Sequence, residues 1–424
     1  ASPFANLASI LSSADWDHED RESQAPTVFR TDEPIQLAGI EVTIFRNYVN
    51  RVAHWLDAFS RDKPFSSSVP GLALHSPVLL HSCLAYSARQ IAFTTKGSAI
   101  DTYERLSVYY YRTALRTLGD LLASMECARG DEVLASSMIL SSYEMLEVIG
   151  ESFASHLKGL AALLQAQGVN GDDIGVRGSV FWAWYRHEIW SCLLNERRMT
   201  LDETYWQPKP VANFDNTTQE EIANRITFIY GQVISFCNEN NRSSDSEVLA
   251  ARKVRLEALE AALADWRRKL PSWMVDFAMD PEPDGFVEDA RRASQRRPFS
   301  SLWFIYPQSA IAHQVYHAAQ ILLALHNPQE EDAVRGLGRQ RSLSVRRHIE
   351  HSREQICLVA SSRIQEELAF ISVQCLFVAG LVTEGKEERR QTLDVIEDCQ
   401  RISGRRTVCI ADELRKVWSL SLEE

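Results

Sequence analysis

The sequence predicts an all-α fold, and three of its features support that prediction. Apolar residues recur at steps of three and four, which places them on one face of a helix. The first such series is Phe45, Tyr48, Val49, Val52, Leu56 and Phe59. No run of alternating polar and apolar residues is bounded by hairpin turns, so we expect few strands or none. Proline or glycine marks many of the predicted helix ends.

The amino-terminal half contains four further predicted helices. They are residues 77–92, 103–121, 131–150 and 156–167. Pro77 begins the first of them, because proline is favourable in a first turn. Asp131 and Ser155 are the predicted N-caps of the last two, and Gly168 ends the fourth.

Residues 179–198, SVFWAWYRHEIWSCLLNERR, form the most aromatic predicted helix. Three Trp, one Phe and one Tyr fall within ten residues of it. Because it is apolar around most of its circumference, we expect it to lie centrally in the fold. The predicted architecture is a large multi-helix domain, with helix-turn-helix pairs packed around this aromatic helix and a solenoid-like character in part.

The remaining segments complete the predicted domain organisation. Further helices are expected at 219–238, 246–270, 302–326, 346–382 (with a break), 386–402 and 411–420. Loops are expected near 276–300 and 327–345. Residues 1–27 are polar and acidic, which is typical of a linker or a loosely attached arm. Residues 28–424 are predicted to form a single all-helical domain.

Charge and hydropathy exclude two classes of partner. The 57 Asp and Glu outnumber the 45 Lys and Arg, for a net charge of -12, and an acidic surface repels nucleic-acid phosphates. We therefore expect no direct nucleic-acid contact by these residues. The longest apolar stretch, 368–382, is shorter than the roughly 18 residues of a membrane span. It is predicted to be a buried core helix, and no membrane partner is expected.

The spacing of cysteine and histidine does not favour a metal site. No two of the eight cysteines lie within four residues of each other, so we expect buried free thiols. His313 with His317 and His348 with His351 have helical spacing, but no third ligand accompanies either pair. We predict no metal site and no cofactor in this chain.

Signatures of the common enzymes are missing from the sequence. It contains no phosphate loop, no dinucleotide-binding turn and neither the GxSxG nor the HExxH pattern. Asp172 and Asp173 are adjacent but lie in a glycine-rich loop without the further acid that a magnesium site needs. We therefore predict no catalytic residues and no enzyme.

The aromatic helix supplies the candidate ligand pocket. The candidate pocket residues are Tyr143, Trp182, Trp184, Tyr185, Arg186 and Trp190. Charged groups in so apolar a segment must point outward or find partners. Arg186 is therefore either a ligand anchor or half of a structural ion pair with Glu188, and the ion pair is favoured.

One segment of the chain is strongly basic. Residues 339–347, RQRSLSVRR, could attract nucleic acid or a nuclear import receptor, although a solvated loop is favoured. Ser342 and Ser344 lie in a basic setting that a kinase could recognise.

Several motifs resemble, in order, the fungal-specific transcription factor domain of zinc-cluster regulators. The first is HWLDAFSRDKPFSSSVPGLALHSPVLLHSCLAYSARQIA, residues 54–92. The others are YYYRTALRTL (109–118), residues 131–146, HLKGLAALL (156–164) and FWAWYRHEI (181–189). In the last motif, Trp184 replaces the family's Tyr and Glu188 is the acid.

The resemblance implies an all-α fold, a nuclear location and regulation of RNA polymerase II transcription. It also implies that DNA contact belongs to an amino-terminal cluster of six cysteines, which would hold the only zinc. None of the eight cysteines has that spacing. Because the chain starts at Ala1 without an initiator Met, we expect it to be a fragment that lacks this cluster.

Three hypotheses about function remain at this stage. In the first, this is a regulatory domain that responds to a small hydrophobic effector or a co-regulator protein by a shift between helix packings. In the second, it is a helical interaction scaffold without a ligand, or a homodimerisation platform. The third, an all-α enzyme, is disfavoured because the chain shows no metal-binding set of carboxylates.

Overall fold

A computed structural model describes residues 30–97, 99–123, 129–147, 151–239, 246–279, 302–327, 338–362, 364–403 and 408–420. Helices dominate these residues, and the β-structure among them is one antiparallel pair of short strands. The all-α prediction is confirmed. The arm predicted at residues 1–27 lies outside the described residues.

The chain divides into two compact units. Unit 1 contains residues 1–195 and 200–208, and unit 2 contains residues 196–199 and 209–424. The single domain expected over 28–424 stays a prediction. Each unit has its own buried core, and each is described separately.

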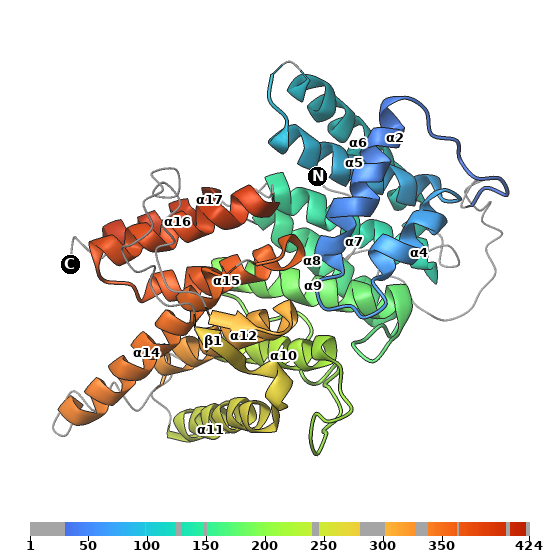
Figure 1. Cartoon of the computed structure of the whole chain (residues 1–424). Helices are drawn as coiled ribbons and strands as arrows, with labels where there is room; N and C mark the ends of the chain where they lie inside the picture. Colours follow the sequence, from blue (N-terminus) through green and yellow to red (C-terminus); the bar gives the residue numbers. More distant parts are fainter. Residues whose placement is uncertain are drawn as a thin grey trace. The chain divides into compact units, whose positions relative to one another are not determined.

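Unit 1 is a stack of helices in the blue to green part of Figure 1. It contains α2 (Ile40–Asn47), a π-helical turn (Tyr48–Val52), α3 (Ala53–Leu56), α4 (Pro64–Ala73), α5 (Pro77–Thr94), α6 (Ile100–Leu122), α7 (Asp131–Glu147), α8 (Glu151–Ala166) and α9 (Gly175–Leu194). Helix α5 packs against α6 and α7, while α9 packs against α4, α7 and α8.

The ends of these helices follow local chemistry in most cases. Pro77 occupies the first turn of α5, as predicted. Gly168 follows α8 with a φ of 64°, and the Val169 amide donates back to the Leu164 carbonyl at 2.9 Å. This is the left-handed helix end that glycine favours. The prediction that Ser155 caps α8 is wrong, because the helix begins at Glu151.

Helix α9 is the predicted aromatic helix, and it is buried nearly all round. Its fully buried residues include Phe181, Trp184 and Tyr185. Burial on several faces requires neighbours on several sides, which α4, α7 and α8 provide. The central position predicted for this helix is confirmed within unit 1.

Unit 2 is the part of Figure 1 that runs from light green (α10) through yellow to red. It contains α10 (Gln219–Cys237), α11 (Ser246–Lys269), a 3-10 turn (Ser272–Met274), β1 (Asp276–Met279), β2 (Leu302–Phe304), α12 (Pro307–Leu325), α14 (Gly338–Ala360), a second 3-10 turn (Glu366–Leu368), α15 (Ala369–Leu381), α16 (Lys386–Ser403) and α17 (Val408–Leu420). Helix α12 packs against α10, α14 and α15.

Three predicted boundaries in unit 2 are wrong. The loop near 276–300 starts with strand β1, and the helix expected from residue 302 starts at Pro307, because 302–304 form β2. The loop expected near 327–345 is helical from Gly338. The intervening residues 280–301 and 328–337 lie outside the described part of the chain.

Helix α15 forms the apolar centre of the carboxy-terminal helices. Eleven of its thirteen residues are buried, as expected for the stretch 368–382. Close packing is visible at Gly380, where an added Cβ would meet the Leu414 side chain of α17. None of the described helices is long and apolar enough to cross a membrane.

Candidate functional site

The aromatic residues of α9 pack in several directions. Trp182 is half-buried and donates its ring N–H to the Gly171 carbonyl at 3.2 Å. Its ring lies edge-on to Trp206, with centroids 5.6 Å apart. Trp184 is fully buried and donates to the Leu157 carbonyl of α8 at 3.0 Å. These two tryptophans therefore tie α9 to different parts of unit 1.

Other candidate pocket residues lie among the same aromatic rings or on a neighbouring helix. The Tyr185 ring is 5.9 Å from the Trp182 centroid and 6.0 Å from the Trp184 centroid. Trp190 is buried further along α9. Tyr143 lies on α7 and stacks on Tyr111 of α6, with ring centroids 4.4 Å apart. Tyr143 thus packs between helices that precede α9 in the chain.

Arg186 is a buried cation that binds backbone. One guanidinium nitrogen donates to the Leu56 carbonyl at the end of α3 at 2.8 Å, and the group lies 5.7 Å from the Phe59 ring centroid. Burial lowers the pKa of Arg186 to about 10, and the charge of Asp57 acts in the opposite direction. At neutral pH the side chain therefore stays charged.

Asp57 caps the amino end of α4. Its carboxylate accepts the Phe65 amide at 3.0 Å and both the amide and the hydroxyl of Ser66 at 2.8 Å. Burial raises the pKa of Asp57, while these hydrogen bonds lower it. Arg186 and Asp57 together fix the turn that joins α3 to α4.

Glu188 contacts a different segment from Arg186. Its carboxylate accepts the Thr200 amide at 3.1 Å and the Thr200 hydroxyl at 2.5 Å. Arg186 and Glu188 thus make structural contacts with backbone on separate sides of α9. The structure brings Trp182, Trp184 and Tyr185 together, while Arg186 points toward α3. The ligand pocket stays a prediction.

A buried set of polar groups lies outside the predicted site. The Tyr111 hydroxyl donates to Glu144, and Nδ1 of His156 contacts the other oxygen of that carboxylate. Burial lowers the pKa of His156 to about 4, so the ring is neutral at neutral pH. These residues come from α6, α7 and α8. The sequence offers no local signal for the set, since the three are 12 to 45 positions apart.

The histidines of α12 are buried against other elements of unit 2. His313 receives a hydrogen bond from Arg267 at 2.9 Å and contacts the Met274 carbonyl at 3.1 Å. His317 contacts the Ser352 hydroxyl of α14 at 3.2 Å. Burial lowers the pKa of both histidines to about 3. Within the described residues, no group of three or more His, Cys, Asp or Glu could hold a metal ion.

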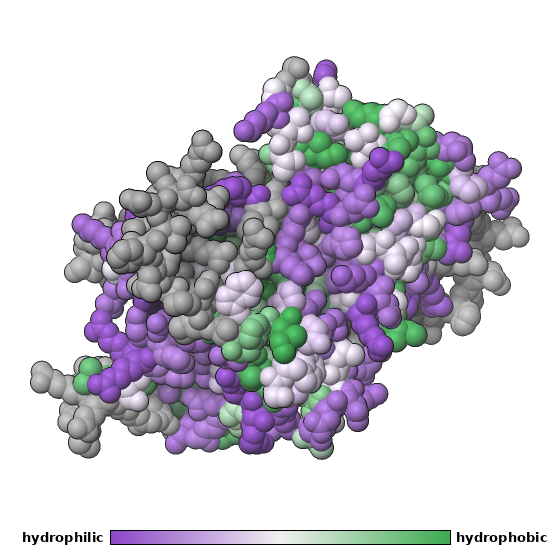
Figure 2. All heavy atoms as spheres, in the orientation of Figure 1, coloured by the Kyte–Doolittle hydropathy of each residue, from purple (hydrophilic) through white to green (hydrophobic). Residues whose placement is uncertain are grey.

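Apolar side chains of β1, of β2 and of the residue after β2 are exposed, and they are here together named the outward sheet face. Leu302 and Phe304 pack inward on the unit 2 core. Phe277, Trp303 and Ile305 point outward, with exposed fractions of 63%, 41% and 55%. Figure 2 shows hydrophobic residues gathered where Figure 1 draws β1.

Tyr306 extends the outward sheet face. It is 38% exposed, and Trp273 lies edge-on to it at 5.7 Å between centroids. Sequence patterning missed this face because each strand is too short to show a period of two. Contiguous exposed apolar residues on a soluble protein commonly mark a binding surface.

The architecture is that of a large all-helical protein made of two compact units. The chain belongs to the family of the fungal specific transcription factor domain, whose model matches residues 43–422. The predicted resemblance is thereby confirmed.

A curated relative adds a partial match. It is "Uncharacterized protein AN5342" of Emericella nidulans, 28% identical over 131 residues, which are 30% of this chain and 28% of that protein. The chain therefore spans just over a quarter of the length of the relative it matches. None of the solved structures matches the chain.

Proposed function

We propose that this chain is the regulatory region of a fungal zinc-cluster transcription factor that acts in the nucleus on RNA polymerase II transcription. The family match over residues 43–422 supports a regulatory rather than a catalytic role. In this proposal DNA contact belongs to a zinc-binding cysteine cluster, as the family resemblance implies; none of the eight cysteines of these 424 residues has the spacing of that cluster.

The outward sheet face carries the proposed mode of action, which is contact with a co-regulator protein. Its four exposed side chains present roughly 400 Å² of accessible surface, from their exposed fractions and the size of such groups. A stable dimer buries about 800 Å² on each partner. The face is therefore too small for a homodimer and fits the apolar stripe of one amphipathic helix.

Addition of a partner strand to the edge of β1 or β2 is the less favoured way for a partner to bind this surface. The paired strands span only three and four residues, and their register shifts between Asp276 and Ala278. Short, irregular edges discourage the addition of another strand. Side-chain packing on Phe277, Trp303 and Ile305 is therefore the proposed recognition mode.

A transcription assay tests this proposal. The chain is fused to an unrelated DNA-binding domain, and reporter output is measured in a fungal host. We expect Phe277→Ser combined with Ile305→Ser to abolish the effect of the chain on the reporter, because the apolar contact is lost. Both residues are mostly exposed, so folding should be preserved.

The matched control is Tyr109→Ser. Tyr109 of α6 is 61% exposed but belongs to unit 1, and its substitution should leave the reporter unchanged. Equal output from the double variant and the unsubstituted chain would refute the role of the outward sheet face. Retention of a small hydrophobic molecule in native mass spectra of the purified chain would instead favour the effector hypothesis at the candidate pocket.

A further inference from the structure

The first side chains of helix α14 that the structure describes are not buried. From Leu343 to His351 each residue is exposed or half-buried, and full burial begins at Ser352. In Figure 1 one end of α14 (orange) extends away from the other helices of unit 2. This first part of the helix is thus held mainly by its own backbone hydrogen bonds.

The same segment has a specific arrangement of arginines. Ser344 follows Arg341 by three positions and Arg339 by five, in the sequence RQRSLS. Basic residues at fixed distances before a serine are the charge pattern by which arginine-directed kinases select substrates, since acidic groups of the kinase bind each guanidinium. Ser342 has Arg339 three positions before it but no arginine at the fifth position.

We infer that Ser344 is a phosphorylation site for an arginine-directed serine kinase. Its side chain is exposed on α14, so the hydroxyl is accessible from solvent. The co-substrate is ATP. The Ser344 oxygen forms a bond to the γ-phosphorus, the bond from that phosphorus to the β-phosphate oxygen breaks, and ADP leaves. The hydroxyl proton passes to a carboxylate of the kinase and then to water.

A kinase cleft binds its substrate in an extended form, so the start of α14 must open. Opening costs little where no side chain is buried, because helix ends fray when tertiary packing is absent. The ion pair from Arg346 to Glu384, at 2.6 Å, joins side chains that are 71% and 79% exposed, and such pairs are weak.

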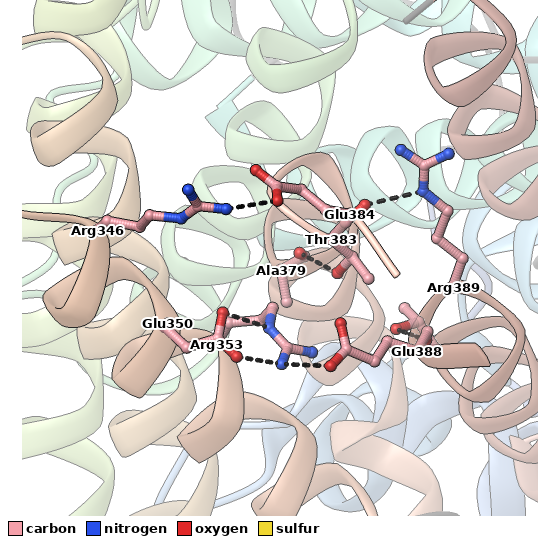
Figure 3. A network of polar contacts seen from close by, with 9 residues as sticks. Arg346, Glu350, Arg353, Ala379, Thr383, Glu384, Glu388 and Arg389 are labelled. Carbon is pink, nitrogen blue, oxygen red and sulfur yellow. Dashed lines mark hydrogen bonds and ion pairs between the residues drawn. The ribbon is translucent and has the colours of Figure 1, made fainter. Parts of the chain in front are cut away.

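Contacts further along α14 limit how much of the helix can unwind. Arg353 is nearly buried and contacts Glu350 at 2.5 Å and Glu388 of α16 at 3.4 Å, as Figure 3 shows. On α16, Arg389 donates to the Thr383 carbonyl at 2.8 Å. The contact of Arg353 with Glu388, together with the burial that begins at Ser352, holds the second half of α14 in place while the first turns open.

Phosphorylation would change the charge of the segment. Residues 339–347 contain four arginines and no acidic residue. A phosphoserine carries about two negative charges at neutral pH, so it would offset about half of that positive charge. Once the helix re-forms, the phosphate lies one turn from Arg347 and His348, which are its helical i+3 and i+4 neighbours.

The test uses the full chain, radiolabelled ATP and a kinase that accepts Arg-x-Arg-x-x-Ser peptides, with the site mapped by tandem mass spectrometry. We expect one phosphate per chain, on Ser344. Ser344→Ala should remove it, and Ser342→Ala should keep it. Arg341→Ala should lower the rate roughly tenfold or more, through loss of a charge-assisted hydrogen bond to the kinase.

A synthetic peptide of residues 336–349 separates recognition from accessibility. Labelling of the peptide but not of the folded chain would show that α14 protects Ser344, and would overturn the inference. So would labelling of neither, or labelling of the chain at another residue. Phosphorylation should also raise the pKa of His348, because a phosphate one turn away stabilises the imidazolium. This pKa can be measured by NMR titration of the His348 ring.

Discussion

Gly178 lies in the first turn of α9, where the chain leaves almost no space. A Cβ at this position would overlap the backbone carbonyl of Asp173. Because the overlap is with backbone, the entry into the aromatic helix must shift to relieve it. We predict that Gly178→Ala lowers the free energy of unfolding of unit 1 by about 2–3 kcal/mol, measured by urea denaturation.

Gly119 provides the matched control for this substitution. It also lies within a helix of unit 1, but a Cβ there would have no neighbour within 4 Å. Gly119→Ala should stabilise the protein by about 0.5–1 kcal/mol, because alanine loses less backbone entropy on folding. Equal effects of the two substitutions would contradict the tight packing at Gly178.

Some residue-scale features could be predicted from sequence and others could not. The burial of Trp184 and Arg186 follows from an apolar helix that must contact neighbours on most sides. Their partners, the carbonyls of Leu157 and Leu56, lie 27 and 130 positions away in the chain. No local pattern indicates such distant contacts, so the sequence could predict that Arg186 is buried but not which groups it contacts.

At the scale of elements, buried histidines make the packing of α12 on α14 sensitive to acid. His317 of α12 contacts Ser352 of α14, and burial lowers its pKa to about 3, with further lowering by His313. The unfolded chain therefore binds a proton that the folded chain does not, between pH about 6.5 and 3. Stability from this group is fully present above pH 6.5 and is lost as the pH falls through that window.

His317→Gln should therefore flatten the pH dependence of stability. We expect the slope between pH 6 and 4.5 to fall by up to about 1.4 kcal/mol per pH unit, measured by urea denaturation at each pH. Ser352→Ala is the control, since it removes the hydroxyl partner but keeps the titrating ring. It should lower stability at every pH without changing the slope. An unchanged slope in His317→Gln would rule out this histidine as the acid-sensitive group.

Long helices with a sustained apolar periodicity could be predicted from the sequence, and short elements could not. Helices α10 and α11 match their predicted ranges to within one residue. Strand β2 was predicted to be helical because its three residues precede an apolar helical run, and the actual start is set by Pro307. The outward sheet face was missed because strands of three and four residues are too short to show a period of two; Trp303 pairs with Ala278 of β1, and Ile305 follows the end of β2.

At the scale of the whole molecule, the sequence predicts the class of protein better than it predicts the domain organisation. Net charge, helical periodicity and the ordered series of motifs were enough to predict an acidic all-helical member of this family. They did not indicate two compact units. Helical patterns continue on both sides of residues 195–209, where the chain passes between the units. The division into units depends on three-dimensional contacts, so it cannot be detected from the hydrophobic pattern alone.

Two compact units, each with a buried core, should unfold in separable steps. Unit 1 is centred on α9 and unit 2 on α12 and α15. Residues that share one buried core unfold cooperatively. Each unit should therefore have its own unfolding transition. We predict that hydrogen exchange of peptides from residues 30–195 and 209–420 shows loss of protection at different urea concentrations.

Substitutions in one unit identify its transition. Gly178→Ala should shift the exchange transition of the unit 1 peptides to lower urea and leave the unit 2 peptides unchanged, because distant sites without shared partners act independently. Ser352→Ala should do the reverse. If either substitution moves the peptides of both units together, the 424 residues unfold as one cooperative domain, and the single domain predicted for residues 28–424 is the correct description.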